Sequence, residues 1–454
     1  MTWHRVVRSL FVFIFSNLVL AAAEPIAPAQ YAFNLDTSVK SYEAVGRTNS
    51  TWDSVARRAM TNFALLRSWT NGAPIQPLRN LQADLVTLAA LKCTDPFIRY
   101  LQLRFAPEAD QAKPAYATEF KAVAEALEKS DYPAIRKSYA HLWAYRLSKQ
   151  GEGDADLLRL AALRLGEALN SKSMPISEAD QACDRLLTTG WWANGKISQL
   201  YSELEPALTR HWSNTFVGLL ARGRAHLSRG WEARGNGSAS TVSAQAFSKF
   251  RQELDQAARA LEAAWNLKED ARVCLEMMRV ELGQNQGRAR LELWFDRGMK
   301  LTPDNYALCS QKLEYLRPRW YGSIEEMVSF GRECMAKPQW SGSVLLMAAD
   351  AHYEASREIQ EEKARVTYWK RAEVWADIRN AFEAFFARYP NEVGYRHNYA
   401  RYAVWCGQWR VADAQFRLFP STNYAYFGGV EQFQQMARTA AAVAAAPAKP
   451  SVTR

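Results

Sequence analysis

The sequence predicts an all-α protein, built as a right-handed solenoid of antiparallel helical hairpins with no significant sheet. Apolar residues recur at helical spacing along most of the chain, short gaps rich in Pro, Gly, Asp and Asn separate these stretches, and no segment shows a convincing strand-like alternation. The 454 residues are 48% hydrophobic and 23% charged, and 16 Trp, 19 Tyr and 20 Phe supply area for a large core. This composition excludes a collagen-like, a largely disordered and a multi-span membrane chain.

Residues 1–23 have the features of a secretory signal peptide. Arg5 and Arg8 lie in a basic start, Leu10–Leu20 forms an apolar core, and Ala21–Ala23 offers a cleavage site. The apolar core is shorter than the roughly 20 residues that span a bilayer, and an uncleaved N-terminal anchor is the alternative interpretation. We therefore expect export to the periplasm or the extracellular space, with no transmembrane span after signal cleavage.

The first half of the mature chain, residues 24–229, is expected to form a helical segment. In Thr51–Trp69 the apolar side chains follow helical spacing, and Asn49, Ser50 and Thr51 are candidate N-caps. The same spacing predicts further helices at Pro77–Leu91, Pro96–Phe105, Tyr116–Lys129, Pro133–Lys149, Ala155–Leu169 and Ser177–Thr189.

The second half is expected to form a separate helical segment, residues 230–436. It begins at Gly230–Ser240, the break richest in Gly and Ser, which is typical of a loop between two segments. Residues 437–454 lose aromatic side chains and end in Pro, Ser and Thr, so we expect a frayed helix and a disordered tail there.

Three stretches combine aromatic and small residues at recurring offsets. They are Trp294–Asn305, residues 399–416 with the small residues Ala400 and Ala412, and, in part, Ala260–Leu267. The pattern resembles the tetratricopeptide repeat, whose small residues let two helices of a hairpin approach closely. The regular spacing of that family is absent, so the resemblance implies divergent repeats.

A wider resemblance covers roughly residues 218–420. It rests on three short words in order, RWYGS at 319–323, GREC at 331–334 and VWADI at 374–378. Together these words resemble an uncharacterised bacterial family of exported helical proteins, described as a domain of unknown function with tetratricopeptide-like helices. The resemblance implies the fold and supplies no activity.

The net charge of +10 is spread evenly along the chain. Because proteins that bind nucleic acid more often concentrate basic residues in a stripe or tail, we expect no nucleic-acid partner. Weak attraction to an anionic polymer of the cell envelope stays open.

The six cysteines are far apart, with no CxxC spacing, so no metal site is expected from them. An exported chain can form disulfides. Cys309 and Cys334 flank the loop near Trp320 at similar distances, and in an antiparallel hairpin such positions face one another. A Cys309–Cys334 disulfide is therefore one interpretation, and six small buried thiols are the other.

Motifs of known enzymes are missing from the chain. There is no HExxH pair, no nucleophile elbow and no phosphate-binding glycine loop, so we expect no catalytic residues, no metal and no cofactor. Helix pairing could bring His352 and His397 together with a carboxylate, but interhelix packing is the better interpretation of both. Glu325 and Glu326 would point about 100° apart on a helix and make a poor acid–base pair.

One loop carries the candidate binding residues Arg317, Arg319, Trp320 and Tyr321. Pro318 should stop the preceding helix, and Ser323 should cap the next one. Two guanidinium groups and two aromatic rings in one tight loop could bind a carboxylate, a phosphate or a peptide terminus. Alternatively, the rings wedge the hairpin while the arginines pair with nearby glutamates.

These observations favour an exported scaffold that binds a peptide, a protein or an envelope component on the concave face of its hairpins. The first alternative is a helical toroid or superhelix enzyme that acts on polysaccharide or peptidoglycan. Such an enzyme would need two carboxylates within about 5–10 Å of each other. The second alternative is a structural subunit of an envelope assembly.

Overall fold

A computed structural model of the chain describes residues 27–69, 75–111, 113, 115–148, 155–171, 173–192, 197–237, 239–419 and 421–446. Within these ranges the regular structure is helical and no strand occurs, so the prediction of an all-α protein is confirmed. The described residues fall into two compact units, one ending at Glu269 and the other beginning at Asp270. The predicted signal peptide, residues 1–23, lies outside the described ranges.

The helices of the first unit are joined by short connections. They are α1 (Pro28–Leu35), the π-helical η2 (Asp36–Lys40), α2 (Ser41–Val45), α3 (Asp53–Ser68), α4 (Ile75–Ala90), α5 (Pro96–Arg104), α6 (Glu108–Gln111), α7 (Tyr116–Glu128), α8 (Ala134–Leu147), α9 (Ala155–Leu169), α10 (Ile176–Trp192), α11 (Ile197–His211), α12 (Phe216–Arg234), η4 (Ala239–Thr241) and α13 (Ala244–Leu267).

Each helix predicted in the first half is present, with bounds that differ by a few residues at most. The predicted cap before α3 is wrong in detail, because the N-cap position belongs to Trp52, which makes no side-chain cap hydrogen bond. A strong cap occurs instead at α5. There Asp95, which is fully buried, accepts hydrogen bonds from the backbone N–H groups of Phe97 and Ile98 at 2.9 and 3.0 Å.

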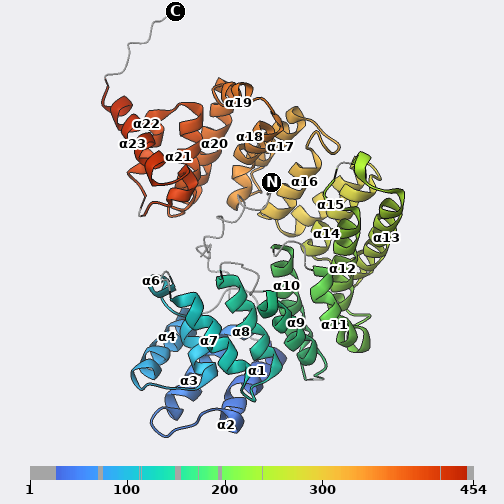
Figure 1. Cartoon of the computed structure of the whole chain (residues 1–454), viewed down its shortest axis with the longest axis vertical. Coiled ribbons are helices and arrows are strands. Elements are labelled where there is room, and N and C mark those ends of the chain that lie inside the picture. The colour runs from blue at the N-terminus through green and yellow to red at the C-terminus, as the bar shows by residue number, and fades with distance from the viewer. Residues whose placement is uncertain are drawn as a thin grey trace, which may run out of the picture. The chain divides into compact units, whose positions relative to one another are not determined.

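Helix α8 lies at the centre of the first unit. It contacts α7 on one side and α9 on the other, and successive helices pack as neighbours through the unit (Figure 1). Most of its residues are buried, including the polar residues Arg136 and His141. A helix buried nearly all round brings its polar side chains into the core, where each needs a partner.

The described part of the second unit has shorter helices and two 3₁₀ turns. Its elements are α14 (Ala271–Gln284), α15 (Arg288–Leu301), α16 (Tyr306–Tyr315), α17 (Ile324–Ala336), η5 (Gly342–Leu346), α18 (Met347–Glu358), α19 (Glu362–Trp369), α20 (Ala372–Arg388), α21 (Tyr395–Cys406), α22 (Trp409–Phe416), η6 (Tyr424–Phe427) and α23 (Val430–Ala445).

Small residues bring helices of the second unit close together. A Cβ atom placed on Gly331 of α17 would lie 2.7 Å from Cα of Ala348 in α18, so only glycine allows this approach. Ala400 of α21 and Ala412 of α22 are fully buried, and these two helices contact each other.

Two segment boundaries differ from those expected. Gly230 lies inside α12, and α12 packs along α13, so the loop near residue 235 joins two helices of the first unit. The second unit begins instead at Asp270, where the side chain caps α14 by accepting from the N–H of Arg272. At the other end, α23 continues to Ala445 into the expected tail, and residues 447–454 lie outside the described ranges.

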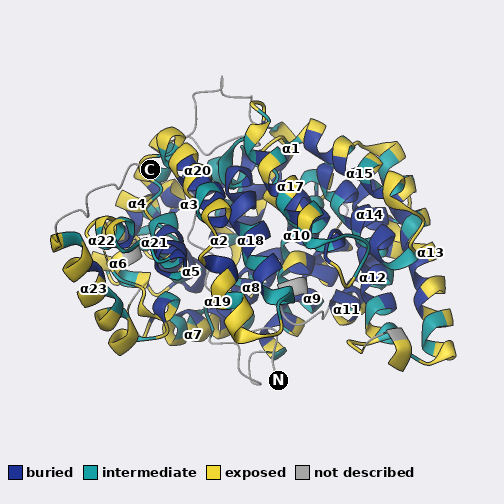
Figure 2. Cartoon of the chain, turned by 90° about the horizontal axis from the view of Figure 1, so that it is seen from above, coloured by how far each residue is buried: buried dark blue, intermediate teal, exposed yellow. Residues whose placement is uncertain are grey.

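Most helices have one buried and one exposed face, whereas α23 is largely exposed (Figure 2). None of the described helices combines the length and the apolar composition that crossing a bilayer demands.

Candidate anion-binding site

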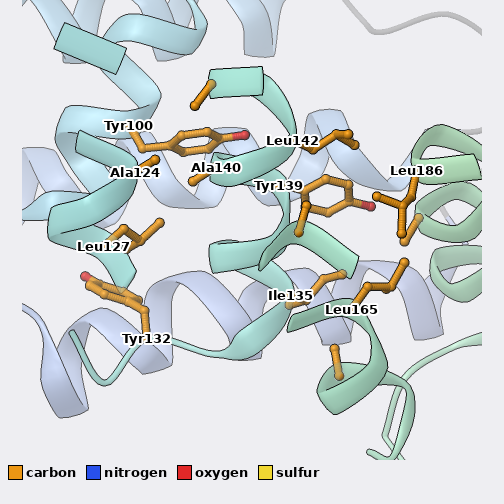
Figure 3. Close-up of a cluster of buried hydrophobic side chains, with 14 of the residues drawn as sticks. Tyr100, Ala124, Leu127, Tyr132, Ile135, Tyr139, Ala140, Leu142, Leu165 and Leu186 are labelled. Atoms are coloured by element: carbon orange, nitrogen blue, oxygen red, sulfur yellow. The ribbon is translucent and has the colours of Figure 1, made fainter. Parts of the chain in front are cut away.

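A stripe of arginine and aromatic residues runs along one face of α8. Arg136, Tyr139, Trp143 and Arg146 are spaced at i, i+3, i+7 and i+10, the spacing that puts side chains on the same side of a helix. Figure 3 shows the ring of Tyr139 extending from α8 towards Leu186. Trp143 is half-buried at the next turn.

Each ring of this stripe lies against two guanidinium groups. The Cζ atoms of Arg67 and Arg185 are 5.0 and 6.0 Å from the centre of the Tyr139 ring. The Cζ atoms of Arg104 and Arg146 are 3.8 and 4.8 Å from the centre of the Trp143 ring. These contacts lie within the range of cation–π attraction. We call Arg67, Arg104, Arg136, Arg146 and Arg185 the arginine cluster.

Two members of the arginine cluster are held by hydrogen bonds. Arg67 donates to the Tyr139 hydroxyl at 2.9 Å and to Glu178, a fully buried carboxylate, at 3.2 Å. Arg136, only 1% exposed, donates to Oδ1 of Asn34 at 2.9 Å and to the hydroxyl of Thr37 at 2.6 Å.

The remaining members of the cluster have no such partners. Within the described residues, the guanidinium groups of Arg104, Arg146 and Arg185 form no hydrogen bond and no ion pair, and their contacts are with aromatic rings. The Nη1 atom of Arg136 is buried and also lacks a hydrogen-bond partner. Several N–H donors of the cluster are therefore available to an added acceptor.

The pKa values reflect this crowding of positive charge. Burial and the field of Arg185 lower the pKa of Arg104, and burial and the field of Arg67 lower the pKa of Arg185. Burial lowers the pKa of Arg136 to about 10. All members stay protonated at neutral pH, so the folded protein keeps this mutual repulsion.

Glu178 offsets only part of the charge. Burial raises the pKa of this carboxyl group, but the fields of Arg67 and Arg136 outweigh burial and hold the pKa below its usual value. Glu178 is thus ionised, one negative charge among five guanidinium groups. An anionic group placed beside Arg104, Arg146 and Arg185 would form charge-assisted hydrogen bonds and reduce the repulsion.

Local structure explains part of this placement. Arg67, Arg104 and Arg146 each lie in the last turn of a helix, where the negative end of the helix dipole favours a cation by about 0.3–1 kcal/mol. Arg185 lies in the middle of α10 and has no such support. The helix dipole therefore accounts for three of the five positions and leaves Arg136 and Arg185 unexplained.

The sequence analysis missed this cluster because its members come from four helices. The available signal was the stripe on α8, where arginine and aromatic residues occupy positions that would be aliphatic in an ordinary core helix. The contributions of α3, α5 and α10 depend on tertiary packing and leave no local pattern.

The loop from Arg317 to Ser323 was expected to bind a ligand, but its side chains contact other residues of the protein. Arg317 is buried and forms ion pairs with three glutamates, Glu314 at 3.2 Å, Glu354 at 2.9 Å and Glu358 at 2.6 Å. Burial lowers the pKa of Arg317, but these carboxylates outweigh it and raise the pKa above its usual value.

The other three residues of the loop also contact the protein itself. Arg319 pairs with Glu314, and the indole N–H of Trp320 donates to the same carboxylate at 2.8 Å. The hydroxyl of Tyr321 donates to the carbonyl oxygen of Leu282 at 3.0 Å. Ser323 caps α17 as predicted, accepting from the N–H of Glu326. The arrangement matches the alternative in which the two aromatic rings pack at the hairpin of α16 and α17 and the two arginines pair with glutamates.

The two cysteines considered for a disulfide are thiols in the structure, and both are fully buried. Burial and a hydrogen bond with Cys309 raise the pKa of the Cys334 thiol. Cys309 also contacts Sδ of Met299 at 3.8 Å. The disulfide itself stays a prediction.

The structure does not bring His352 and His397 to a common carboxylate. His352 is 2.9 Å from Oδ2 of Asp377 and 2.7 Å from the Tyr368 hydroxyl. His397 stacks on Phe419, with ring centres 3.9 Å apart. Across the described part of the chain, no group of three or more His, Cys, Asp or Glu side chains could hold a metal ion.

A scan against protein-family models finds no match for this chain, and a search of curated proteins finds no similar sequence.

Proposed function

We propose that this protein is an exported helical-repeat scaffold that binds an anionic polymer through the arginine cluster. In this proposal the hairpins of each unit stack as a right-handed solenoid with divergent tetratricopeptide-like repeats. The bound groups are carboxylates or phosphates, supplied by an acidic peptide segment or by an envelope polymer.

The observation that supports binding is the set of guanidinium groups without acidic partners. Arg104 and Arg146 stack on the Trp143 ring, Arg185 stacks on the Tyr139 ring beside Arg67, and the carboxylate Glu178 is already bound by Arg67. Assembling uncompensated like charges costs stability, and such a cost is commonly found where a site is built for a ligand.

The rings of Tyr139 and Trp143 give the site a defined geometry. Arginine side chains that stack on aromatic rings lose little further freedom when they bind a ligand. Two N–H groups of one planar guanidinium can then donate to two oxygens of the same carboxylate or phosphate.

The test is calorimetric titration of the protein with hexaglutamate and, separately, with inorganic polyphosphate. In the binding variant, Arg104, Arg146 and Arg185 are all changed to Gln. In the control variant, three arginines with exposed ion pairs, Arg57, Arg159 and Arg229, are changed to Gln. Both variants remove three positive charges from the first unit.

We expect the binding variant to lose at least tenfold in affinity and the control variant to lose less than threefold. Binding should weaken with added salt, because the attraction is electrostatic. A stronger response to hexaglutamate identifies a peptide ligand, and a stronger response to polyphosphate identifies a phosphate polymer. Equal losses in both variants, or no binding of either probe, would contradict the proposal.

Export is tested separately by cell fractionation and by sequencing the N-terminus of the mature protein. We expect a periplasmic or extracellular product that begins near Glu24. A full-length product recovered from the cytoplasm would contradict this part of the proposal.

A further inference from the structure

A hollow of about 440 Å³ lies in the first unit, where α4 ends and α5 begins. Its lining residues are Ala89, Lys92, Cys93, Thr94 and Arg99. Among these, the side chains of Lys92, Thr94 and Arg99 carry strong hydrogen-bond donors. Hollows of this volume hold small organic molecules, so there is room for more than a single small ion.

The backbone of Lys92 has a conformation that disfavours a side chain. Its φ of 53° lies in the left-handed region, and its N–H donates to the carbonyl oxygen of Ala89 at 3.0 Å, which closes the last turn of α4. Glycine adopts this conformation without steric cost and is the usual residue at such a helix end. The positive charge of Lys92 is favourable near the end of α4, but its backbone is strained. Strain of this kind is concentrated at binding sites.

Arg99 also occupies a position that local structure disfavours. It is the fourth residue of α5, and the first turn of this helix has no acidic side chain. The positive end of the helix dipole lies there and disfavours a cation. Nη1 of Arg99 donates to Oε1 of Gln102 at 2.8 Å, and Nε2 of Gln102 donates to the carbonyl oxygen of Leu85 at 3.3 Å. These contacts hold the guanidinium group beside the hollow without a carboxylate.

The donors around the hollow are not used by the protein itself. Within the described residues, Lys92 and Arg99 form no ion pair, and the Thr94 hydroxyl forms no hydrogen bond. Asp95 follows directly in the chain, but its carboxylate is fully buried and accepts from backbone N–H groups and from the Tyr132 hydroxyl. An ammonium, a guanidinium and a hydroxyl group therefore remain for a ligand.

We propose that this hollow binds a small phosphate monoester, with the phosphate group held by Lys92, Thr94 and Arg99. These three donors belong to different positions of the wall. A tetrahedral phosphate offers acceptor oxygens in several directions, whereas the two oxygens of a carboxylate lie in one plane. Ala89 and the buried Cys93 form the less polar part of the wall, which leaves room for the organic part of the ester.

The hollow is separate from the arginine cluster, although α5 contributes to both. Arg99 and Arg104 are five residues apart, so their side chains point about 140° apart around the helix axis. Arg104 packs on the Trp143 ring of α8, whereas the lining residues of the hollow come from α4, α5 and the connection between them. Separate variants can therefore test the two sites, and failure of one proposal leaves the other intact.

The test is calorimetric titration of the full chain with glucose 6-phosphate and, separately, with glucuronate, a sugar of similar size that carries a carboxylate. Arg99→Gln removes the guanidinium group, and Lys92→Gly removes both the ammonium group and the backbone strain. Arg79→Gln is the control, because it removes an exposed charge that lies about 15 Å before Ala89 along α4. Thermal unfolding of each variant establishes that it is folded.

We expect the affinity for glucose 6-phosphate to fall at least tenfold in Arg99→Gln and at least threefold in Lys92→Gly. It should change less than twofold in Arg79→Gln and in the binding variant of the arginine cluster. Lys92→Gly should unfold at the same or a higher temperature than the unaltered chain, because glycine relieves the strain. A loss of affinity without a loss of stability separates a binding role of Lys92 from a structural one.

Four outcomes would overturn the proposal. The first is no binding of glucose 6-phosphate to the unaltered chain, and the second is unchanged affinity in Arg99→Gln or in Lys92→Gly. The third is an equal loss in Arg79→Gln or in the binding variant, which would show general charge attraction or binding at the arginine cluster. The fourth is glucuronate binding as tight as that of glucose 6-phosphate, which would assign the hollow to carboxylates.

Discussion

Arg104 stacks its guanidinium group 3.8 Å from the centre of the Trp143 ring, and within the described residues it pairs with no carboxylate. The same ring contacts Arg146, and one turn earlier Tyr139 lies between Arg67 and Arg185. An aromatic surface thus takes the place that acidic side chains usually have around clustered arginines.

Removing one charge from this cluster should make the protein more stable. For Arg185→Gln we expect the free energy of unfolding to rise by about 1 kcal/mol, because repulsion from Arg67 and the cost of burying the charge both disappear. Arg185 is mid-helix, so no dipole stabilisation is lost. Urea unfolding at low and at high salt measures the change.

The matched control for that experiment is Arg164→Gln. Arg164 pairs with Glu128 and with Glu167, so its loss should destabilise the protein by about 0.5–2 kcal/mol. The gain in the free energy of unfolding of Arg185→Gln should become smaller with added salt, because salt screens the repulsion between Arg185 and Arg67. A loss of stability in Arg185→Gln would mean that its charge is compensated.

Asp350 should make the stability of the protein depend on pH. Its pKa is about 7 in the folded state and 3.8 in an ordinary environment, so between pH 4 and pH 7 the folded state binds a proton that the unfolded state releases. This contribution to stability is fully present below pH 4 and is lost as the pH rises through 7.

Asp350→Asn should therefore be more stable than the unaltered protein at pH 8, by about 1–3 kcal/mol, and nearly equal to it at pH 4. The upper limit for such a shift is roughly 4 kcal/mol, reduced here because solvent reaches the carboxyl group. Urea unfolding of both proteins across this pH range measures how the difference in their free energies of unfolding changes with pH. A curve that is flat between pH 4 and pH 8 would contradict the prediction.

The loop from Arg317 to Ser323 should contribute stability and not affinity for the anionic probes. Arg317→Gln leaves Glu314, Glu354 and Glu358 without their shared cation, and we expect a loss of about 2–4 kcal/mol. Arg319→Ala should cost less than about 1 kcal/mol, because its ion pair is largely exposed. Urea unfolding measures the free energy of unfolding of each variant and so tests whether the two losses differ.

The same loop variants also test the earlier expectation of a binding role. Folded Arg319→Ala and Trp320→Ala should bind hexaglutamate as the unaltered protein does. A loss of affinity in either variant, with stability retained, would restore the binding interpretation of the loop.

Cys334 should resist alkylation in the native protein. Burial and its hydrogen bond with Cys309 raise the pKa of the thiol, so at pH 8 it is protonated and unreactive. Iodoacetamide labelling followed by mass spectrometry should modify it only after unfolding. In protein recovered from an oxidising compartment, peptide mapping without reductant should find Cys309 joined to Cys334 if the disulfide forms there. Rapid native labelling of Cys334 would contradict its buried environment.

Glycine at the crossing of α17 and α18 should be required for packing. Gly331→Ala places a Cβ atom 2.7 Å from a backbone atom of Ala348, and we expect a loss of about 1–3 kcal/mol. Gly230→Ala in α12 meets side chains at 3.3 Å or more, and a higher helix propensity should make it neutral or slightly stabilising. Thermal unfolding measures the stability of both variants. Equal changes in stability would contradict the close approach of α17 to α18.

The sequence by itself determined the local structure of this protein. The helical spacing of apolar residues located α3, α4, α5 and α7 to α10 within a few residues, because that periodicity depends on the chain alone. The cap by Ser323 also followed from the short-range sequence pattern.

Only the tertiary structure decided which charged side chains meet. Arg317 looks available in the loop sequence, but its partner Glu358 lies 41 residues away and cannot be assigned from spacing. Arg67, Arg104 and Arg185 look like ordinary helix residues, but folding places them around two rings of α8. Periodicity is a property of one helix, whereas electrostatic energy depends on distances between helices, and those distances exist only in the folded chain.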